Sequence, residues 1–441
     1  MTDQDPNCRH EAVVSHDDVM QLRGSYQAWA LGFTSALLMS AGFITFTMPA
    51  QADQAIAASP AEAKVNNRIS KRIKNPAIGP DLAMVVMDAQ TQRIVSSLNA
   101  DKPMLPASNM KIITATNALS TMQPGQAFTT KVLAGSSPGS IILQGGGDPL
   151  LSAANLRALA DSTAALIDHS QPLIVNTDVN LFPKETNGPG WTKGYVPSVV
   201  SPVSALAMLG DYSKTPVVHA VDVFIKELEA KGLSAARGSE LDASADAAQL
   251  ASISPHTTAD AVHRMLLDSE NNVAENLFRH VALTTNYPPT WQGASTAAIA
   301  NLNALGINTA GLRIADGSGV SRSDRLNALA LAAVLRLAIV GDPARFAAMF
   351  DPGSLPTSGI DGTLDSKFHR YSSRPSSCAR GAIRAKTGTL HDTIALSGTV
   401  RDADGALKVF SFLVNERPTS VSPLRTRQAI DGLASTITGC W

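Results

Sequence analysis

Three short polar motifs, far apart in the chain, most constrain what it can fold into. They are the S-x-x-K tetrad Ser108–Lys111, the S-x-N triplet Ser269–Asn271 and the K-T-G-T run Lys386–Thr389. The first opens a predicted helix, the second lies in a long predicted helical segment, and the third opens a predicted strand. Ser108 and Ser269 are 161 residues apart, and a further 117 residues lead to Lys386. The elements around these motifs predict a mixed α and β chain.

The S-x-x-K tetrad is a candidate nucleophile and its base. Residues i and i+3 share one face of a helix, so the Lys111 amine can reach the Ser108 hydroxyl. A serine hydroxyl is a weak nucleophile until a nearby base takes its proton, and a helix N-terminus favours the developing negative charge. Roughly one S-x-x-K is expected by chance in a chain of this length, and Ser108 alone can equally be a helix N-cap.

The K-T-G-T run can form one wall of a binding site. Gly388 has no side chain, so a ligand can lie against this strand edge. Lys386 and Thr387 can hold a substrate carboxylate. The backbone N–H of Thr389 can pair with that of Ser108 as an oxyanion hole. Taken alone, the run is also an ordinary basic start of a strand.

The S-x-N pattern occurs twice in the chain. Ser97–Asn99 lies on a predicted strand before the candidate nucleophile, which is the wrong order, so Ser269 and Asn271 are the candidates. Alone, such a triplet is most often a capping or surface segment.

Together and in this order, the three motifs resemble the signature set of active-site serine penicillin-binding proteins and β-lactamases. Further segments resemble one subfamily, the D-alanyl-D-alanine carboxypeptidase/endopeptidase family of low-molecular-mass class C penicillin-binding proteins (peptidase family S13). The resemblance extends from about Asp81 to the C-terminus. Its segments are LQGGGDPLL (143–151), PGW (189–191), PVSAL (202–206), AENLFRH (274–280) and DGSGVSR (316–322).

The resemblance implies a β-lactamase/transpeptidase-like α/β fold, in which an antiparallel sheet is flanked by helices and interrupted by an inserted domain. The gap behind Ser108 is too long for a bare β-lactamase-type domain. We therefore expect a catalytic domain split between residues 81–123 and 251–441, an inserted domain over 124–250, and a linker with an N-terminal helix over 53–80.

Periodicity predicts several elements of this fold. The Ala-rich stretch Ala55–Lys64 is predicted to be linker, and Thr258–Leu283 to be one long helical segment. Strands are predicted over 81–88, 93–99, 382–390, 393–402 and 407–415, and a closing helix over 423–437.

The resemblance also implies a reaction, the hydrolysis of the bond between two D-alanines at the end of a peptidoglycan stem peptide. Ser108 attacks the carbonyl and Lys111 acts as general base. Lys386 carries like charge near Lys111 and helps to lower the pKa of Lys111. The enzyme is then a serine-type D-Ala-D-Ala carboxypeptidase, with DD-endopeptidase action on cross-links as a further activity.

The same resemblance assigns the other motif residues. Ser269 relays a proton toward the leaving amine, and Asn271 orients Lys111 and the substrate amide. Thr387 and Thr389 bind the terminal carboxylate. The family usually has Asp where this chain has Glu270, a position that is not expected to take part in the chemistry.

β-Lactam antibiotics are expected to acylate Ser108 and to remain bound. No E-x-x-L-N element, which activates a deacylating water in class A β-lactamases, follows the nucleophile. A serine β-lactamase or esterase is one alternative, and a catalytically silent peptidoglycan-binding protein is another. The complete motif set disfavours the silent protein.

The N-terminal region is expected to direct export. Ala28–Met48 is a run of 21 residues without charge, and the A-x-A pattern Ala50–Ala52 follows it. We interpret residues 1–52 as a secretory signal peptide, with an uncleaved membrane anchor as the alternative. Either places the bulk of the chain outside the cytoplasm. There, Cys378 and Cys440 are expected to form one disulfide, the alternative being two buried thiols.

Composition excludes some functions. Lys and Arg total 36 and Asp and Glu total 37, so the net charge of −1 gives no basis for binding nucleic acid. The histidines form no H-E-x-x-H or similar spacing, so neither a metal nor another cofactor is predicted. Trp191 and Tyr195 can line a cleft or serve packing alone.

Overall fold

The computed structural model describes residues 58–184 and 187–441. The predicted signal peptide or anchor over residues 1–52 lies outside this part. Within it, no helix combines the length and the apolar character needed to cross a membrane.

One sheet joins the two ends of the described chain. Its five strands are all antiparallel and follow the order β2-β1-β10-β9-β8. Their bounds are β1 Asp81–Asp88, β2 Ile94–Leu98, β8 Ile383–Thr389, β9 Ile394–Arg401 and β10 Leu407–Asn415. The predicted strands are confirmed. β1 pairs with β10 along its whole length, so the first strand lies inside the sheet beside the last.

Both faces of this sheet are buried, which explains why β1 is apolar almost throughout. Alternate residues of a strand point to opposite faces. Ala83 and Val85 face one hydrophobic core, whereas Met84 and Val86 face another.

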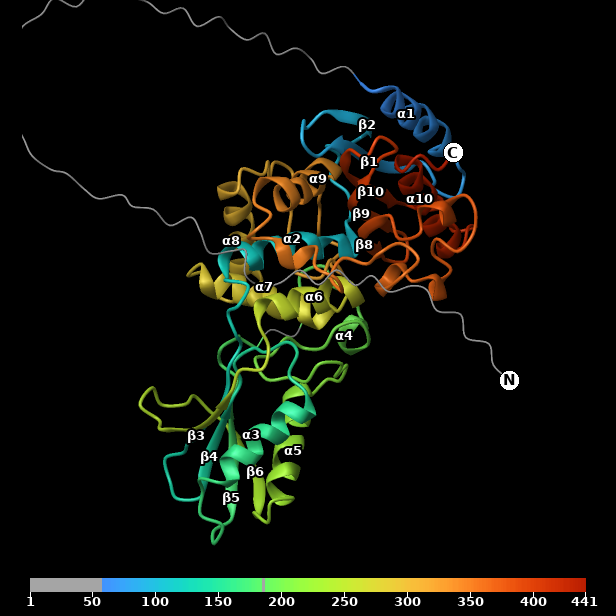
Figure 1. Ribbon diagram of the computed structural model, residues 1–441. Helices are drawn as coiled ribbons and strands as arrows, with labels where there is room; N and C mark the ends of the chain where they lie inside the picture. Colours follow the sequence, from blue (N-terminus) through green and yellow to red (C-terminus); the bar gives the residue numbers. More distant parts are fainter. Residues whose placement is uncertain (1–57, 185–186) are drawn as a thin grey trace, which may run out of the picture. The chain divides into compact units, whose positions relative to one another are not determined.

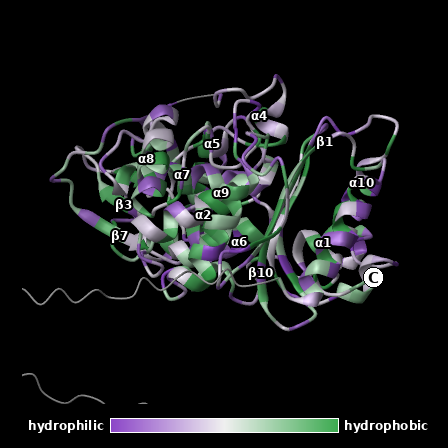
Figure 2. Ribbon diagram, turned by 90° about the horizontal axis from the view of Figure 1, so that it is seen from above, coloured by the Kyte–Doolittle hydropathy of each residue, from purple (hydrophilic) through white to green (hydrophobic). Residues whose placement is uncertain are grey.

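Helices cover the sheet on both sides (Figures 1 and 2). α1 and α10 pack on one face, and α9 lies against the other. Behind α9, α2 and α6 to α8 complete the same core. The bounds are α1 Pro60–Arg72, α2 Met110–Thr121, α6 Thr258–Asp268, α7 Asn271–Thr284, α8 Trp291–Ala304, α9 Ala328–Arg336 and α10 Pro423–Ile437.

The linker predicted for Ala55–Lys64 is wrong from Pro60 onward, because α1 begins there. The Ser59 side chain accepts from the backbone N–H of Glu62, and the Glu62 carboxylate accepts from that of Ser59. This capping box and the proline at the first helical position are strong signals for the start of a helix. The linker prediction rests on the Ala-rich composition alone, without these two signals.

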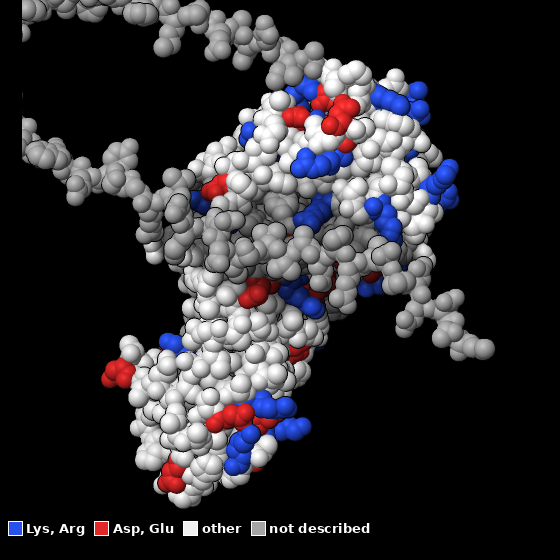
Figure 3. Space-filling view, viewed as in Figure 1, with Lys and Arg blue, Asp and Glu red and all other residues white. Residues whose placement is uncertain are grey.

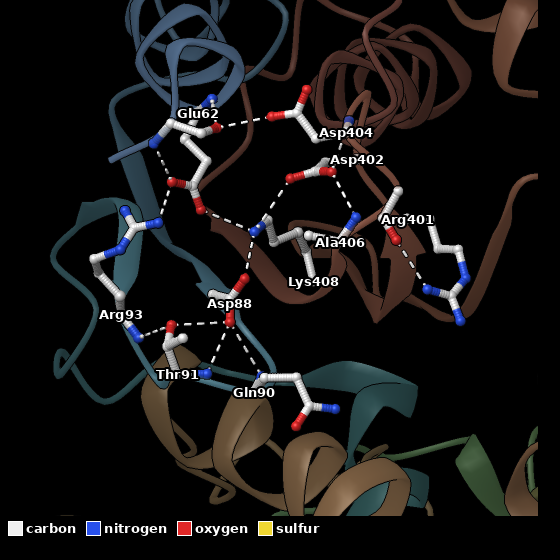
Figure 4. Close-up of polar contacts among 12 residues, drawn as sticks. Glu62, Asp88, Gln90, Thr91, Arg93, Arg401, Asp402, Asp404, Ala406 and Lys408 are labelled. Atoms are coloured by element: carbon white, nitrogen blue, oxygen red, sulfur yellow. Dashed lines mark hydrogen bonds and ion pairs between the residues drawn. The ribbon is translucent and has the colours of Figure 1, made fainter. Parts of the chain in front are cut away.

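A buried lysine joins α1 to the sheet (Figure 4). The Lys408 amine on β10 lies 2.8 Å from a Glu62 oxygen, 3.1 Å from an Asp402 oxygen and in contact with Asp88. Arg93 forms a further ion pair with Glu62. The cluster holds the first helix of the described chain on the back of the sheet.

The stretch of chain that follows α2 and precedes α6 forms a second, mixed sheet. Its order is β6-β5-β4-β3-β7, with β4, β5 and β6 parallel and the pairs with β3 antiparallel. α3 and α5 pack on it around a third core. The bounds are β3 Thr130–Ala134, β4 Ser140–Gln144, α3 Ala153–Ala164, β5 Leu173–Asp178, α5 Pro216–Glu229, β6 Ala235–Glu240 and β7 Gln249–Ile253. β7 spans the boundary expected at residue 250, and the division into a split domain and an insertion stays a prediction.

Cys378 and Cys440 are joined by a disulfide, as predicted. The bond ties the segment before β8 to the end of the chain after α10. The alternative of two buried thiols is wrong.

Candidate active site

Ser108 lies in a short, strained turn rather than in the α-helix itself. Ala107–Asn109 forms a 3₁₀ turn, and α2 starts at Met110. Ala107 has φ +47°, a conformation that costs energy for a residue with a Cβ. Gly319 packs against this turn so closely that a Cβ there would lie 1.9 Å from the Ala107 oxygen. The surrounding fold therefore fixes the position of the Ser108 hydroxyl.

The Lys111 amine is fully buried next to that hydroxyl. Its Nζ lies 3.1 Å from Ser108 Oγ and donates to Asn271 Oδ1 at 2.8 Å. It also donates to the backbone oxygen of Ser318 at 2.7 Å. An ammonium group has three donors, and each has a partner here.

Burial favours the neutral form of the Lys111 amine. It lowers the pKa of Lys111 to about 8, while the carboxylates of Asp316 and Glu275 oppose the shift. The pKa of Lys386 is also lowered, first by burial and then by the charge of Lys111. Burial is therefore the leading cause at both amines. The charge of Lys386, which is expected to help lower the pKa of Lys111, is not among the leading causes there.

The single helical segment predicted for Thr258–Leu283 is wrong at the S-x-N motif. α6 ends at Asp268, Ser269 is left-handed with φ +63°, and Glu270 is the N-cap of α7. Such a backbone conformation is uncommon for a serine and interrupts the helix. The break places Ser269 in the wall of the cavity that Ser108 also lines.

Asn271 is the first residue of α7 and is held at both ends of its amide. Nδ2 donates to the backbone oxygen of Val199 at 2.8 Å, which turns Oδ1 toward Lys111. Within the described residues, Glu270, the middle residue of the motif, makes no hydrogen bond to Lys111 or Ser108. Its carboxylate accepts a hydrogen bond from the Tyr212 hydroxyl at 2.8 Å instead.

Gly388 provides room for the turn that carries Ser108. A Cβ there would lie 2.9 Å from the Pro106 oxygen and 3.0 Å from Asn109 Nδ2. The atoms closest to this Cβ position belong to the protein itself, and the approach of a ligand to this strand edge stays a prediction. Gly388 thereby lets β8 pack closely against the turn that carries Ser108.

Ser108, Ser269, Thr387 and Thr389 meet in one cavity of about 270 Å³. The predicted amines are not in its wall. Lys111 is buried beneath Ser108, and Lys386 is buried with its Nζ 3.1 Å from the Thr387 oxygen. The other lining residues are Thr363, Phe368, Arg370 and Arg427. No motif marks these four, and three come from the irregular segment before β8, so the sequence analysis missed them.

Two buried carboxylates fix the turn around Ser318, whose backbone oxygen accepts from Lys111. No role is predicted for either of them from the sequence. Glu275 accepts from the backbone N–H groups of Gly317 and Ser318 at 3.0 and 2.8 Å. Asp316 accepts from that of Gly319 at 2.7 Å. Burial, and then the charge of Asp316, raise the pKa of Glu275. Glu275 and Asp316 lie in two of the segments that carry the family resemblance, AENLFRH (274–280) and DGSGVSR (316–322), which was the available signal.

Trp191 does not line the cavity beside Ser108 and serves packing instead. Its Nε1 donates to Asp316 Oδ2 at 2.8 Å, and its ring meets Trp291 edge-on at 5.1 Å. The segment between β5 and α5 thus supports the Asp316 turn.

The visible surface has no dominant sign of charge. Figure 3 shows acidic and basic side chains interspersed on a mostly uncharged face. Within residues 58–184 and 187–441, no group of three or more His, Cys, Asp or Glu side chains is arranged to hold a metal ion.

Known proteins are similar to this chain in sequence and in fold. A sequence profile of the D-Ala-D-Ala carboxypeptidase 3 (S13) family matches residues 65–212 and 193–437. The chain is 31% identical over 408 residues to carboxypeptidase Rv3627c of Mycobacterium tuberculosis, covering 87% of this chain and 86% of that protein. It is 26% identical over 456 residues to a D-alanyl-D-alanine carboxypeptidase of an Actinomadura species, covering 81% and 82%.

The fold is that of penicillin-binding protein 4 from Haemophilus influenzae. The TM-score is 0.73 at 18% identity, over 84% of this chain and 98% of that one. The predicted mixed α/β fold is confirmed. Taken together, the profile match and the relatives show that this chain belongs to the D-Ala-D-Ala carboxypeptidase 3 (S13) family.

Proposed function

We propose that this protein is a serine D-Ala-D-Ala carboxypeptidase that cleaves peptidoglycan stem peptides through an acyl-enzyme. The observation that carries the proposal is the buried Lys111 amine, 3.1 Å from Ser108 Oγ and aligned by Asn271. Family membership and the relatives named as D-alanyl-D-alanine carboxypeptidases support the choice of substrate.

Acylation starts at Ser108. Its Oγ attacks the carbonyl carbon of the penultimate D-Ala as its proton passes to the neutral Lys111 amine. The backbone N–H groups of Ser108 and Thr389 stabilise the resulting oxyanion. The C–N bond then breaks, and Ser269 passes a proton from Lys111 to the leaving amine of the terminal D-Ala.

Deacylation completes the reaction. Water attacks the ester carbonyl, its proton passes to Lys111, and the shortened peptide leaves as Ser108 regains its proton. A β-lactam ring mimics the scissile bond, but its leaving group stays attached, so the adduct at Ser108 persists. A structure of Haemophilus influenzae penicillin-binding protein 4 in complex with a β-lactam, with a TM-score of 0.66, supports this reading of the shared fold.

This activity belongs outside the cytoplasm, where peptidoglycan lies. We therefore propose an exported enzyme with residues 81–123 and 251–441 as its catalytic domain and 124–250 as the insertion. The disulfide between Cys378 and Cys440 supports an oxidising compartment.

The test is release of D-Ala from an acylated tripeptide ending in D-Ala-D-Ala. We expect turnover by the wild type and none by Ser108→Ala, while the exposed serine variant Ser162→Ala on α3 keeps full activity. A peptide ending in L-Ala-L-Ala should be inert. Penicillin binding without D-Ala release would support the silent alternative, and fast penicillin hydrolysis would support the β-lactamase.

A further inference from the structure

The cavity beside Ser108 contains an unpaired positive charge. Among its described lining residues only Arg370 and Arg427 are charged. Arg370 is neutralised, since its Nε and Nη2 donate to the two Asp431 oxygens at 2.7 and 2.6 Å. Arg427 makes no hydrogen bond and no ion pair in the described part of the chain.

The pairing of Arg370 explains why Arg427 stays free. Arg427 and Asp431 are four residues apart on α10, a spacing at which opposite charges on a helix normally pair. Both Asp431 oxygens are occupied by Arg370 instead. Arg427 is half-buried, and a guanidinium remains charged at any physiological pH.

The other residues predicted to hold a carboxylate place no charged group in the wall of this cavity. Thr387 and Thr389 present neutral hydroxyls to the cavity. The Lys386 amine is fully buried and hydrogen-bonded to the Thr387 oxygen. A peptide ending in D-Ala-D-Ala and a penicillin both carry a carboxylate near the bond that is cleaved. A guanidinium, with its fork of donors, suits such a group well.

We propose that Arg427 binds the carboxylate of the ligand in this cavity and so selects free acids over their esters and amides. The identity of the peptide ligand rests on the proposed function. The charge preference can be measured without it, because β-lactams acylate the same serine.

The experiment measures the rate constants for acylation by benzylpenicillin and by its methyl ester. The variants are Arg427→Gln, Arg427→Lys and, as a matched control, Arg425→Gln. Arg425 is exposed on the same helix and lines a different surface hollow. Thermal unfolding of each variant verifies that it folds.

We expect the wild type to prefer the acid, and Arg427→Gln to lower this preference about 10- to 100-fold by slowing the acid reaction alone. Arg427→Lys should keep most of the preference, and Arg425→Gln all of it. An unchanged preference in folded Arg427→Gln would overturn the proposal, as would absence of any preference in the wild type. Acylation with the expected preference but without D-Ala release would contradict the proposed function alone.

Discussion

The Lys111 amine and the side-chain oxygen of Asn271 lie 2.8 Å apart, although 160 residues separate them in the chain. The contact depends on the break at Ser269, which makes Asn271 the first residue of a new helix. Two helices and one strand edge thereby converge on Ser108.

Asn271→Ala should slow acylation of Ser108 by penicillin about 100-fold, because Lys111, the proposed base, loses the group that orients it. Stability should fall by about 1–3 kcal/mol, because the buried Lys111 amine and the Val199 carbonyl each lose a hydrogen-bond partner. Time-resolved mass spectrometry of the adduct measures the rate. Asn66→Ala, at an exposed position of α1, is the control. Equal acylation rates in both variants would show that Asn271 does not orient Lys111 for this reaction.

The rate of acylation should rise with pH. Burial lowers the pKa of Lys111 to about 8, and only the neutral amine can accept the proton from Ser108. Well below pH 8 the rate constant should therefore increase about tenfold per pH unit, and it should level off above pH 8. A rate that is constant between pH 6 and 9 would contradict the role of Lys111 as the base.

Gly388→Ala should impair acylation by displacing the turn that carries Ser108, the proposed nucleophile. The added methyl group would lie 2.9 Å from the Pro106 oxygen, a contact that only a backbone shift relieves. We expect at least a 10-fold slower reaction with penicillin, since small misplacements of catalytic groups are costly. Gly125→Ala, whose Cβ would meet nothing within 4 Å, should react normally. Normal rates in both would show that the close approach has no catalytic consequence.

Lys408→Met should destabilise the fold by about 3–5 kcal/mol, because it leaves buried carboxylates without their cation. The exposed Lys102–Asp81 pair provides the control, and Lys102→Met should cost less than about 1 kcal/mol. Urea unfolding measures both variants. Equal costs would show that the Lys408 cluster is not an anchor for α1.

The same cluster predicts a pH dependence of stability. Burial opposes ionisation of Asp88, but hydrogen bonds from Lys408 and Thr91 outweigh it and lower the pKa of Asp88 from 3.8 to about 2. A lowered pKa stabilises the fold above the unfolded-state value. The contribution, about 2 kcal/mol, should therefore be complete above pH 4 and be lost as the pH falls toward 2. In Asp88→Asn this part of the acid dependence should be missing.

The motifs predicted which residues meet, but not how the backbone presents them. Strands such as β1 and β10 could be predicted because long apolar runs bounded by polar turns have few other structures. The left-handed conformation of Ser269 could not, since neither glycine nor proline marks the break. Arg427 could not be predicted either. Its exposure to the cavity depends on Arg370 occupying Asp431, a contact between an irregular segment and a helix 61 residues later.

The most direct test of the central claim is the mass of the protein after reaction with benzylpenicillin, followed by peptide mapping. The account predicts that the wild type gains the mass of one penicillin molecule and that the label maps to Ser108. Ser108→Ala should gain none, and Ser162→Ala should behave as the wild type does. A label on any other residue, or an adduct that persists in Ser108→Ala, would contradict the site described for this enzyme.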